Sequence, residues 1–231
     1  MGYLSFYYIA FISRIYSLMK QFLPFVFFSL SLFTNAQEIA ILKYNGGGDW
    51  YANPTALPNL IAFTNRHSNT NIAKNPATVA VGNSAIFNFP ILFLTGHGNV
   101  YFSESEAQNL RNYLISGGFL HISDNYGLDQ FIRREMKKVF PELEFKEIPA
   151  DHRIYKQKFI FENGIPKIHE HDNKRPQGFG LFYQGRLICF YDYETDLSDG
   201  WEDANIHNNP KEVREKALKM GANIIQYAFK N

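Results

Sequence analysis

Short apolar runs alternate along this chain with clusters of glycine and polar residues. Residues 39–42, 91–94 and 119–122 are such runs, and glycine, histidine, aspartate or asparagine follows each of them within a few positions. A short apolar run bounded by turn residues is typical of a strand buried on both faces of a parallel sheet. In open α/β sheets, ligands bind just outside the carboxyl ends of the strands. The pattern therefore predicts a binding site where these three runs end.

Helical patterns lie between the runs. Residues 57–67 and 128–140 place apolar side chains on one helical face, and a short strand is expected at 78–81. Ser103 and Glu106 form a capping-box pattern at the start of a further helix. This repeated alternation of strand and helix predicts an α/β fold, with a mostly parallel sheet and helices on both faces.

The pattern changes after residue 141. Residues 143–148 and 157–161 are predicted to be strands, and residues 180–183 with 187–191 are predicted to form an antiparallel C-terminal hairpin. A last helix is expected to open at Asn209, with Pro210 at its first position and the acidic residue Glu212 in its first turn. We expect this helix to pack against the sheet and complete the domain.

The first 36 residues differ in composition from the rest. They contain Arg14 and Lys20, no acidic residue, and a dense apolar stretch that ends shortly before Ala36. A basic region, an apolar core and a small residue at the cut are the features of a secretory signal peptide. We therefore predict a signal peptide at 1–36, with Met19 as an alternative start, and a single α/β domain at 37–231. The expected location is periplasmic or extracellular, and a retained N-terminal anchor is the alternative.

Charge and cysteine content exclude several classes of protein. The 23 basic and 22 acidic residues give a net charge of +1, and loss of Arg14 and Lys20 with the leader would leave 21 against 22, or −1. Such a balance lacks the clustered basic face that nucleic-acid binding requires. The single cysteine, Cys189, forms no intramolecular disulfide and is expected to be a buried hydrophobe. No nucleophile elbow of the Gly-x-Ser-x-Gly type is present, which disfavours acyl-transfer hydrolysis.

The polar residues that follow the three apolar runs are the candidate site. We predict that a polar ligand is bound by Gly47, Gly48, Asp49, Trp50, His97, Asp124 and Asn125. Glycine lets the backbone approach a ligand closely, and Asp49 and Trp50 add a carboxylate and a ring at the same place. The alternative is a flexible turn that uses its glycines only for positive φ angles.

His97 and Asp124 are the best catalytic candidates. His97 lies between two glycines just past a strand, where an imidazole can act as a base, a metal ligand or a hydrogen-bond donor. Asp124 follows a neighbouring strand and could orient His97 or bind a cation. An Asx-turn that begins the next helix is the alternative role for Asp124. His121 lies inside its run and is expected to be a packed core histidine.

Two further segments resemble metal-binding chemistry, but their spacing is wrong. His169 and His171 are two residues apart, whereas the zincin motif needs histidines four apart on a helix, so a solvated turn is expected. The carboxylates of residues 192–203 suit hard cations but do not follow the EF-hand spacing, which favours an exposed acidic loop. Trp201 in this stretch is a candidate for an exposed sugar-stacking ring, and His152 is a further free histidine. We therefore predict no metal ligands.

Four stretches of the chain together resemble an uncharacterised bacterial family. They are residues 42–51, 95–98, 124–127 and 199–203, which read LKYNGGGDWY, TGHG, DNYG and DGWED. Members of that family are exported or membrane-anchored and are described only as a domain of unknown function. The resemblance covers essentially all of residues 37–231 and implies a flavodoxin-like sandwich similar to class I glutamine amidotransferases. No residue here matches the amidotransferase cysteine, so glutaminase activity and catalytic residues are not implied.

Three functional hypotheses remain open. The first is an exported protein that binds a glycan or another polar envelope component at the strand ends. The second is a hydrolase that uses His97 with Asp124, with or without a metal. The third is a non-catalytic accessory subunit of an envelope complex. The expected partner is a polar small molecule or glycan, with no nucleic acid and with membrane contact only through an uncleaved leader. The pattern specifies neither a cofactor nor an oligomeric state.

Overall fold

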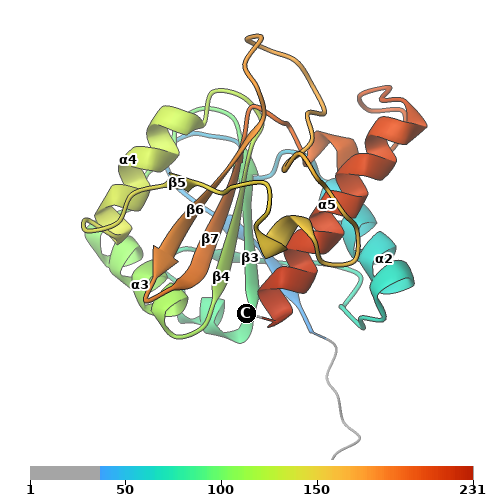
Figure 1. The fold of residues 1–231 in the computed structure, drawn as a ribbon. Helices are drawn as coiled ribbons and strands as arrows, with labels where there is room; N and C mark the ends of the chain where they lie inside the picture. Colours follow the sequence, from blue (N-terminus) through green and yellow to red (C-terminus); the bar gives the residue numbers. More distant parts are fainter. Residues whose placement is uncertain (1–36, 231) are drawn as a thin grey trace, which may run out of the picture. The chain divides into compact units, whose positions relative to one another are not determined.

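The computed structural model describes residues 37–230, so the predicted leader at 1–36 lies outside the described residues. The described chain forms a sheet of 7 strands in the order β2-β1-β3-β4-β7-β6-β5 (Figure 1). The strands are β1 (Ile39–Lys43), β2 (Ala77–Ala80), β3 (Ile91–Gly96), β4 (Phe119–Asp124), β5 (Lys146–Glu147), β6 (Gln177–Tyr183) and β7 (Arg186–Tyr193). In this order, the strands β2, β1, β3, β4 and β7 are parallel to their neighbours. Strand β6 pairs antiparallel with β7, and β5 pairs antiparallel with β6. The predicted α/β class, with a mostly parallel sheet and an antiparallel end, is confirmed.

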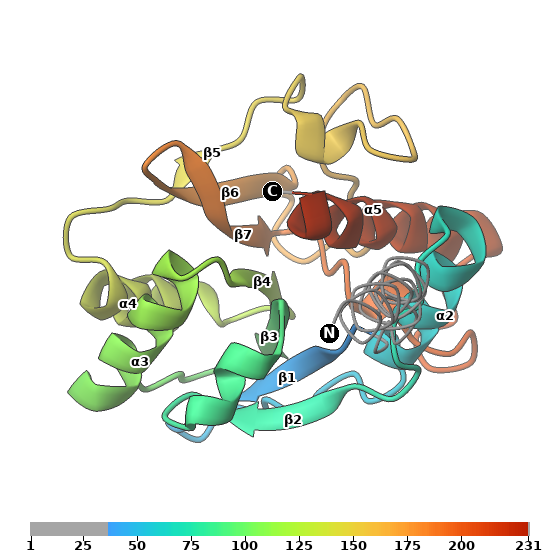
Figure 2. The same ribbon diagram turned by 90° about the horizontal axis from the view of Figure 1, so that it is seen from below.

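Helices cover both faces of this sheet. The α-helices are α2 (Ala56–Ser68), α3 (Glu104–Ile115), α4 (Asp129–Val139) and α5 (Lys211–Lys230). Three 3₁₀ turns accompany them, namely η1 (Ser84–Asn88), η2 (Arg153–Tyr155) and η3 (Asp199–Trp201). Figure 2 shows α3 and α4 on one face and α2 and α5 on the other. Within residues 37–230, no helix is both long and apolar enough to cross a membrane.

The central strands explain why their sequences read as continuous apolar runs. Leu92 and Leu94 of β3 belong to the core cluster that contains α3 and α4 side chains, whereas Ile91 and Phe93 belong to the cluster beneath α2 and α5. Successive side chains of a strand point to opposite faces, so a strand covered on both sides is apolar at most positions, and its buried polar side chains need partners. The same covering leaves only the strand ends available for polar chemistry.

Two helices begin in different ways. For α3, Ser103 Oγ accepts a hydrogen bond from the Glu106 amide at 3.2 Å and Glu106 Oε2 accepts one from the Ser103 amide at 2.7 Å, which confirms the predicted capping box. For α2, no local side chain caps the first turn. Instead, Glu202 Oε1 accepts hydrogen bonds from the backbone amides of Thr55 and Ala56, at 2.8 and 3.1 Å. A residue distant in the sequence thus caps the first turn of α2.

Two predicted strands differ in the structure. Only Lys146 and Glu147 of the segment 143–148 are in a strand, and residues 157–161 form no strand. The buried side chain of Asn223, on α5, takes the place of a neighbouring strand there. Its Oδ1 accepts hydrogen bonds from the backbone amides of Lys158 and Phe159, both at 3.0 Å, and its Nδ2 donates to the Phe159 carbonyl at 2.6 Å. These backbone groups of Lys158 and Phe159 are therefore satisfied without a neighbouring strand.

Candidate functional site

The sheet places the loops that follow β1 and β3 next to each other. Chain order reverses at this point, because β2 lies on one side of β1 while β3 and then β4 lie on the other. The carboxyl ends of parallel strands meet at one edge of a sheet, and the point of reversal is where open α/β sheets bind ligands. Asp49 lies in the loop after β1, and His97 directly follows β3.

Asp49 and His97 form a direct pair at this reversal point. Asp49 Oδ2 lies 3.0 Å from His97 Nδ1, and Asp49 Oδ1 accepts a short hydrogen bond from the His97 backbone amide. The side chains are 34% and 54% exposed, respectively. No hydrogen bond within residues 37–230 occupies His97 Nε2, so the carboxylate fixes the ring and leaves its second nitrogen available. A histidine that acts as a base or as a hydrogen-bonding group toward a ligand is oriented by a carboxylate in the same way.

The glycines beside Asp49 have different roles. A Cβ atom on Gly48 would lie 2.7 Å from the carbonyl oxygens of His97 and Asn99, and the Gly48 amide donates to the Asn99 carbonyl at 3.0 Å. Gly48 therefore lets the two loops pack backbone against backbone. Gly47, in contrast, has a φ of +89° and nothing within 4 Å of its Cβ position. Of the two glycines, Gly47 is the one whose backbone is open to a ligand.

Trp50 is partly structural. It is half-buried against the core cluster beneath α3 and α4, and the Lys43 ammonium lies 5.3 Å from its ring centroid. Its edge meets the ring of Tyr51, whose centroid lies 5.5 Å away. The ring exposed at this loop is therefore that of Tyr51, with 65% of the residue in solvent.

Asp124 and Asn125 lie beneath the surface. Asp124 Oδ1 accepts the Leu128 backbone amide at 3.0 Å, which is the turn contact that begins α4, and Oδ2 accepts the Tyr191 hydroxyl at 3.1 Å. Burial raises the pKa of Asp124 to about 6, although both hydrogen bonds oppose the rise. Asn125 Oδ1 accepts from the Ser198 hydroxyl at 2.8 Å. Within the described chain, Asp124 does not contact His97, so the predicted orienting carboxylate is replaced by Asp49.

Three exposed tyrosines mark the same edge of the sheet. Tyr51, Tyr101 and Tyr126 follow β1, β3 and β4, and they are 65%, 48% and 48% exposed. The sequence analysis missed them because single aromatic residues in loops carry no pattern. Trp201, the aromatic residue that we expected to be exposed, is fully buried, and its Nε1 donates to the Ala217 carbonyl at 2.9 Å. That expectation was wrong because η3 packs against α5.

The acidic stretch 192–203 is a mostly buried polar belt, which corrects the expectation of an exposed loop. Asp192 is fully buried, and its Oδ2 lies 2.6 Å from Nε2 of His121, itself 4% exposed. Burial raises the pKa of Asp192, and the hydrogen bond from His121 opposes that rise. Glu194 is paired with Lys167 and Lys174, each at 3.4 Å. These partners are distant in sequence, which is why composition alone suggested solvent.

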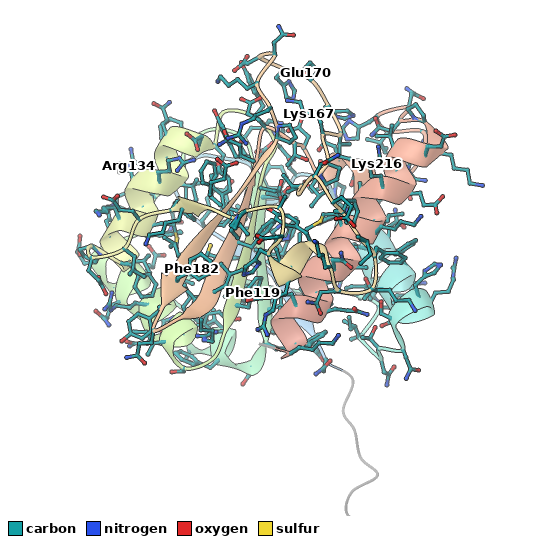
Figure 3. All side chains as sticks on the ribbon, viewed as in Figure 1. Phe119, Arg134, Lys167, Glu170, Phe182 and Lys216 are labelled. Atoms are coloured by element: carbon teal, nitrogen blue, oxygen red, sulfur yellow. The ribbon has the colours of Figure 1, made fainter. Side chains whose placement is uncertain are left out.

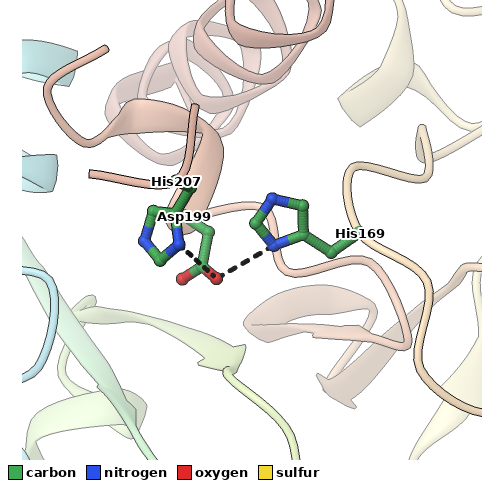
Figure 4. A group of neighbouring side chains, drawn as sticks. All are labelled: His169, Asp199 and His207. Atoms are coloured by element: carbon green, nitrogen blue, oxygen red, sulfur yellow. Dashed lines mark hydrogen bonds and ion pairs between the residues drawn. The ribbon is translucent and has the colours of Figure 1, made fainter. Parts of the chain in front are cut away.

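Three histidines lie against the carboxylates of this polar belt. His171 Nε2 contacts Asp196 Oδ2, while Asp199 Oδ2 lies 3.1 Å from His169 Nδ1 and 3.7 Å from His207 Nδ1 (Figure 4). The hydrogen bond with Asp199 raises the pKa of His169. Burial alone would raise the pKa of Asp199, but hydrogen bonds from His169 and Asn53 bring it below its ordinary value. The segment expected to be a solvated turn is therefore anchored to the polar belt.

Two other candidates are structural. His152 Nδ1 accepts the Ile154 backbone amide at 3.2 Å and so caps η2, and burial lowers its pKa. Cys189 is fully buried in β7, where burial raises the thiol pKa well above its ordinary value. The expectation that Cys189 is a buried hydrophobe is confirmed, as is the burial of His121 in the core.

Comparison with protein families gives one match, and it spans nearly all of the described chain. The family model is described as Domain of unknown function (DUF4159), and it matches residues 38–229. The chain belongs to the DUF4159 family. The DUF4159 domain thus begins one residue before β1, ends within α5, and includes the Asp49–His97 pair and the histidines of the polar belt. No curated protein matches this DUF4159 chain.

Proposed function

We propose that this DUF4159 domain binds a polar ligand of the glycan class at the carboxyl ends of β1 and β3. The observation that carries the proposal is the Asp49–His97 pair, which is solvent-exposed and lies where the strand order reverses. The loops that carry Asp49 and His97 pack backbone against backbone at Gly48, and an ion pair on the surface would not require such close packing for stability. A site that presents an imidazole to a ligand does require it, because the packing fixes the position of the ring.

The topology supports this placement. The parallel strands β2-β1-β3-β4-β7 follow the order 2-1-3-4-5 that flavodoxin-like sheets use, and those sheets bind their ligand at the β1/β3 reversal. On this basis we propose a flavodoxin-like sandwich, related in fold to the glutamine amidotransferases. The chain offers no exposed cysteine for amidotransferase chemistry, since Cys189 is buried. Binding is therefore a better supported function than glutamine hydrolysis.

The side chains at this edge favour a polyhydroxylated ligand. Asp49 offers carboxylate oxygens to ligand hydroxyl groups, and His97 Nε2 can donate or accept a further hydrogen bond. Tyr51 and Tyr126 present large exposed rings in the adjoining loops, and aromatic side chains with a polar tip suit a surface that contacts both apolar and hydroxylated faces. If the leader directs export, envelope glycans are the ligands that such a domain would meet.

Substitution of His97 should weaken binding without unfolding the protein. We expect His97→Ala to weaken binding of an envelope oligosaccharide at least about tenfold, because the oriented imidazole is lost. The stability should change by no more than about 0.5 kcal/mol, since the side chain is 54% exposed. A panel of soluble envelope oligosaccharides would be screened with the wild-type full chain, and each hit would be quantified by calorimetry.

The matched control is His67→Ala, which removes another exposed histidine in the last turn of α2. It should bind like the wild type. Asp49→Asn, which keeps an oxygen for the His97 backbone amide, should weaken binding but preserve the fold. Unchanged affinity in both His97→Ala and Asp49→Asn would exclude the pair as the binding site. Cleavage of a bound oligosaccharide that disappears in His97→Ala would instead favour the hydrolase hypothesis.

A further inference from the structure

We propose that His169, Asp199 and His207 bind one divalent transition-metal ion, and that zinc fits the site best. The three residues come from the loop before β6, from η3 and from the loop before α5, and their side chains converge on one point (Figure 4). The site uses none of the residues of the proposed ligand site. It therefore goes beyond the proposed function, and either proposal can fail without the other.

The spacing of the ligand atoms suits a single ion. Asp199 Oδ2 lies 3.1 Å from His169 Nδ1 and 3.7 Å from His207 Nδ1, and one ligand atom from each residue lies within 4.8 Å of the other two. Zinc bonds of about 2.0–2.2 Å at tetrahedral angles place neighbouring ligand atoms ~3.3 Å apart. Small side-chain rotations would bring the three atoms to that separation.

The residues around the three ligands form an outer shell. Asn53 Nδ2 donates to Asp199 Oδ1 at 2.6 Å, and His169 Nε2 lies 2.7 Å from Asn209 Oδ1. Metal-binding histidines usually donate their second ring nitrogen to an oxygen, and metal-binding carboxylates are themselves hydrogen-bonded. In a neutral ring whose Nε2 donates to Asn209, Nδ1 carries a lone pair toward the Asp199 carboxylate. A cation bound between these two atoms would take the place of the proton that joins them in the metal-free protein.

His207 has no hydrogen bond among residues 37–230. Its closest polar approach is the 3.7 Å separation from Asp199, which is too long for a hydrogen bond, and its Nε2 is buried without a partner. Its side chain is nevertheless only 28% exposed. The nitrogen that faces Asp199 is Nδ1, and it has no hydrogen bond within the described residues. A metal ion at the meeting point of the three side chains would bind this atom.

The loop that carries His169 is held in place. Its backbone is attached to the loop after β7, because the Ile168 amide donates to the Thr195 carbonyl at 3.0 Å. Lys167 then bridges Glu170, at 3.5 Å, and the buried Glu194, at 3.4 Å. Figure 3 shows Lys167 and Glu170 on the loop that extends beyond the strand ends. Anchoring of this kind orients a ligand before the ion arrives.

The ligand types select the class of metal. Calcium and magnesium prefer sites made entirely of oxygen atoms, whereas imidazole suits zinc and its transition-metal neighbours. Two histidines and one carboxylate are also the protein ligands of several catalytic zinc sites, which keep a fourth position for water or substrate. The predicted absence of metal ligands rested on two spacings, that of His169 and His171 and that of the carboxylates in residues 192–203. Asp199 and His207 join His169 only through the fold.

Zinc titration of the full chain tests the proposal. The protein would carry no histidine tag and would be treated with chelator before titration against a competing chromophoric chelator. We expect one zinc ion per chain with a Kd of about 1 µM or lower. His207→Ala should weaken that affinity at least about tenfold, and Asp199→Asn should do the same while it keeps an oxygen for Asn53.

His171→Ala is the near control, because His171 lies in the same loop but contacts Asp196. Its zinc affinity should stay within about twofold of the wild type. Circular dichroism and a melting curve without zinc confirm that each variant is folded. His207→Ala is the decisive variant, since it breaks no hydrogen bond of the described chain. Failure of the wild type to bind zinc below ~0.1 mM, or wild-type affinity in His207→Ala, would overturn the proposal.

Discussion

Replacing His121 with leucine should lower the free energy of unfolding by about 3–5 kcal/mol. His121 lies inside β4, where its Nε2 is 2.6 Å from Asp192 Oδ2 and both side chains are almost fully buried. Leucine would leave the Asp192 carboxylate in the core with the Ser123 hydroxyl as its remaining side-chain donor. A buried charge that loses its partner has neither water nor an opposite charge to stabilise it. Urea unfolding at pH 7 measures the loss.

The double variant His121→Leu/Asp192→Leu separates charge from packing. A buried ion pair replaced by apolar side chains is often close to neutral, so the double variant should recover most of the stability that the single variant loses. The matched control is Glu147→Gln, which breaks the exposed ion pair with Arg175 and should cost no more than about 1 kcal/mol. A single-variant loss no larger than that of the control would show that the His121–Asp192 pair does not stabilise the core.

The sheet could be predicted because local patterns specify it. The runs before Gly96 and Asp124 are apolar at successive positions, since both faces of these strands are covered. The start of α3 could be predicted because its capping box is complete within four residues, from Ser103 to Glu106. The start of α2 could not be read in the same way, because its cap is Glu202.

The candidate site was only partly accessible to sequence reasoning. The glycine and polar clusters located the correct edge of the sheet, because strand ends that carry such residues are exposed to ligand. The carboxylate that pairs with His97 was harder to predict. Asp124 and Asp49 both follow strands next to β3, and the choice depends on which loop folds over β3. The close approach that Gly48 permits decides in favour of Asp49.

The histidine cluster needed tertiary structure for a different reason. His169 is separated from Asp199 by the strands β6 and β7, and Asp199 from His207 by a loop, so no spacing rule joins the three residues. Periodicity identifies residues on one face of one element. It says nothing about side chains that meet where three loops cross. The same limit applies to Asn223, which stabilises residues 158 and 159 from the middle of α5.

Substitution of Asp124 is the second change for which we expect a large effect on stability. Asp124 is a buried carboxyl group that shares the hydroxyl group of Tyr191 with Asp129. The Tyr191 hydroxyl lies 3.1 Å from Asp124 Oδ2 and 3.0 Å from Asp129 Oδ1, but it has one hydrogen to donate. A protonated Asp124 can donate to Tyr191, which then donates to Asp129. An ionised Asp124 competes with Asp129 for the same hydrogen. Burial and the nearby carboxylates Asp129 and Asp192 favour the protonated form and raise the pKa from 3.8 to about 6, against the hydrogen bonds from Leu128 and Tyr191.

Asp124→Asn should therefore become more favourable relative to the wild type as pH rises. Because the folded pKa is above the unfolded one, the wild type loses the contribution of Asp124 between about pH 4 and pH 6. A shift of about two pKa units corresponds to at most ~3 kcal/mol. Asparagine keeps an oxygen for the Leu128 amide and offers Tyr191 a permanent donor. Urea unfolding of both proteins from pH 4 to pH 7 isolates this residue, because the other carboxylates titrate in both. A stability difference that stays constant across that range would mean that Asp124 is an ordinary ionised carboxylate in the folded protein.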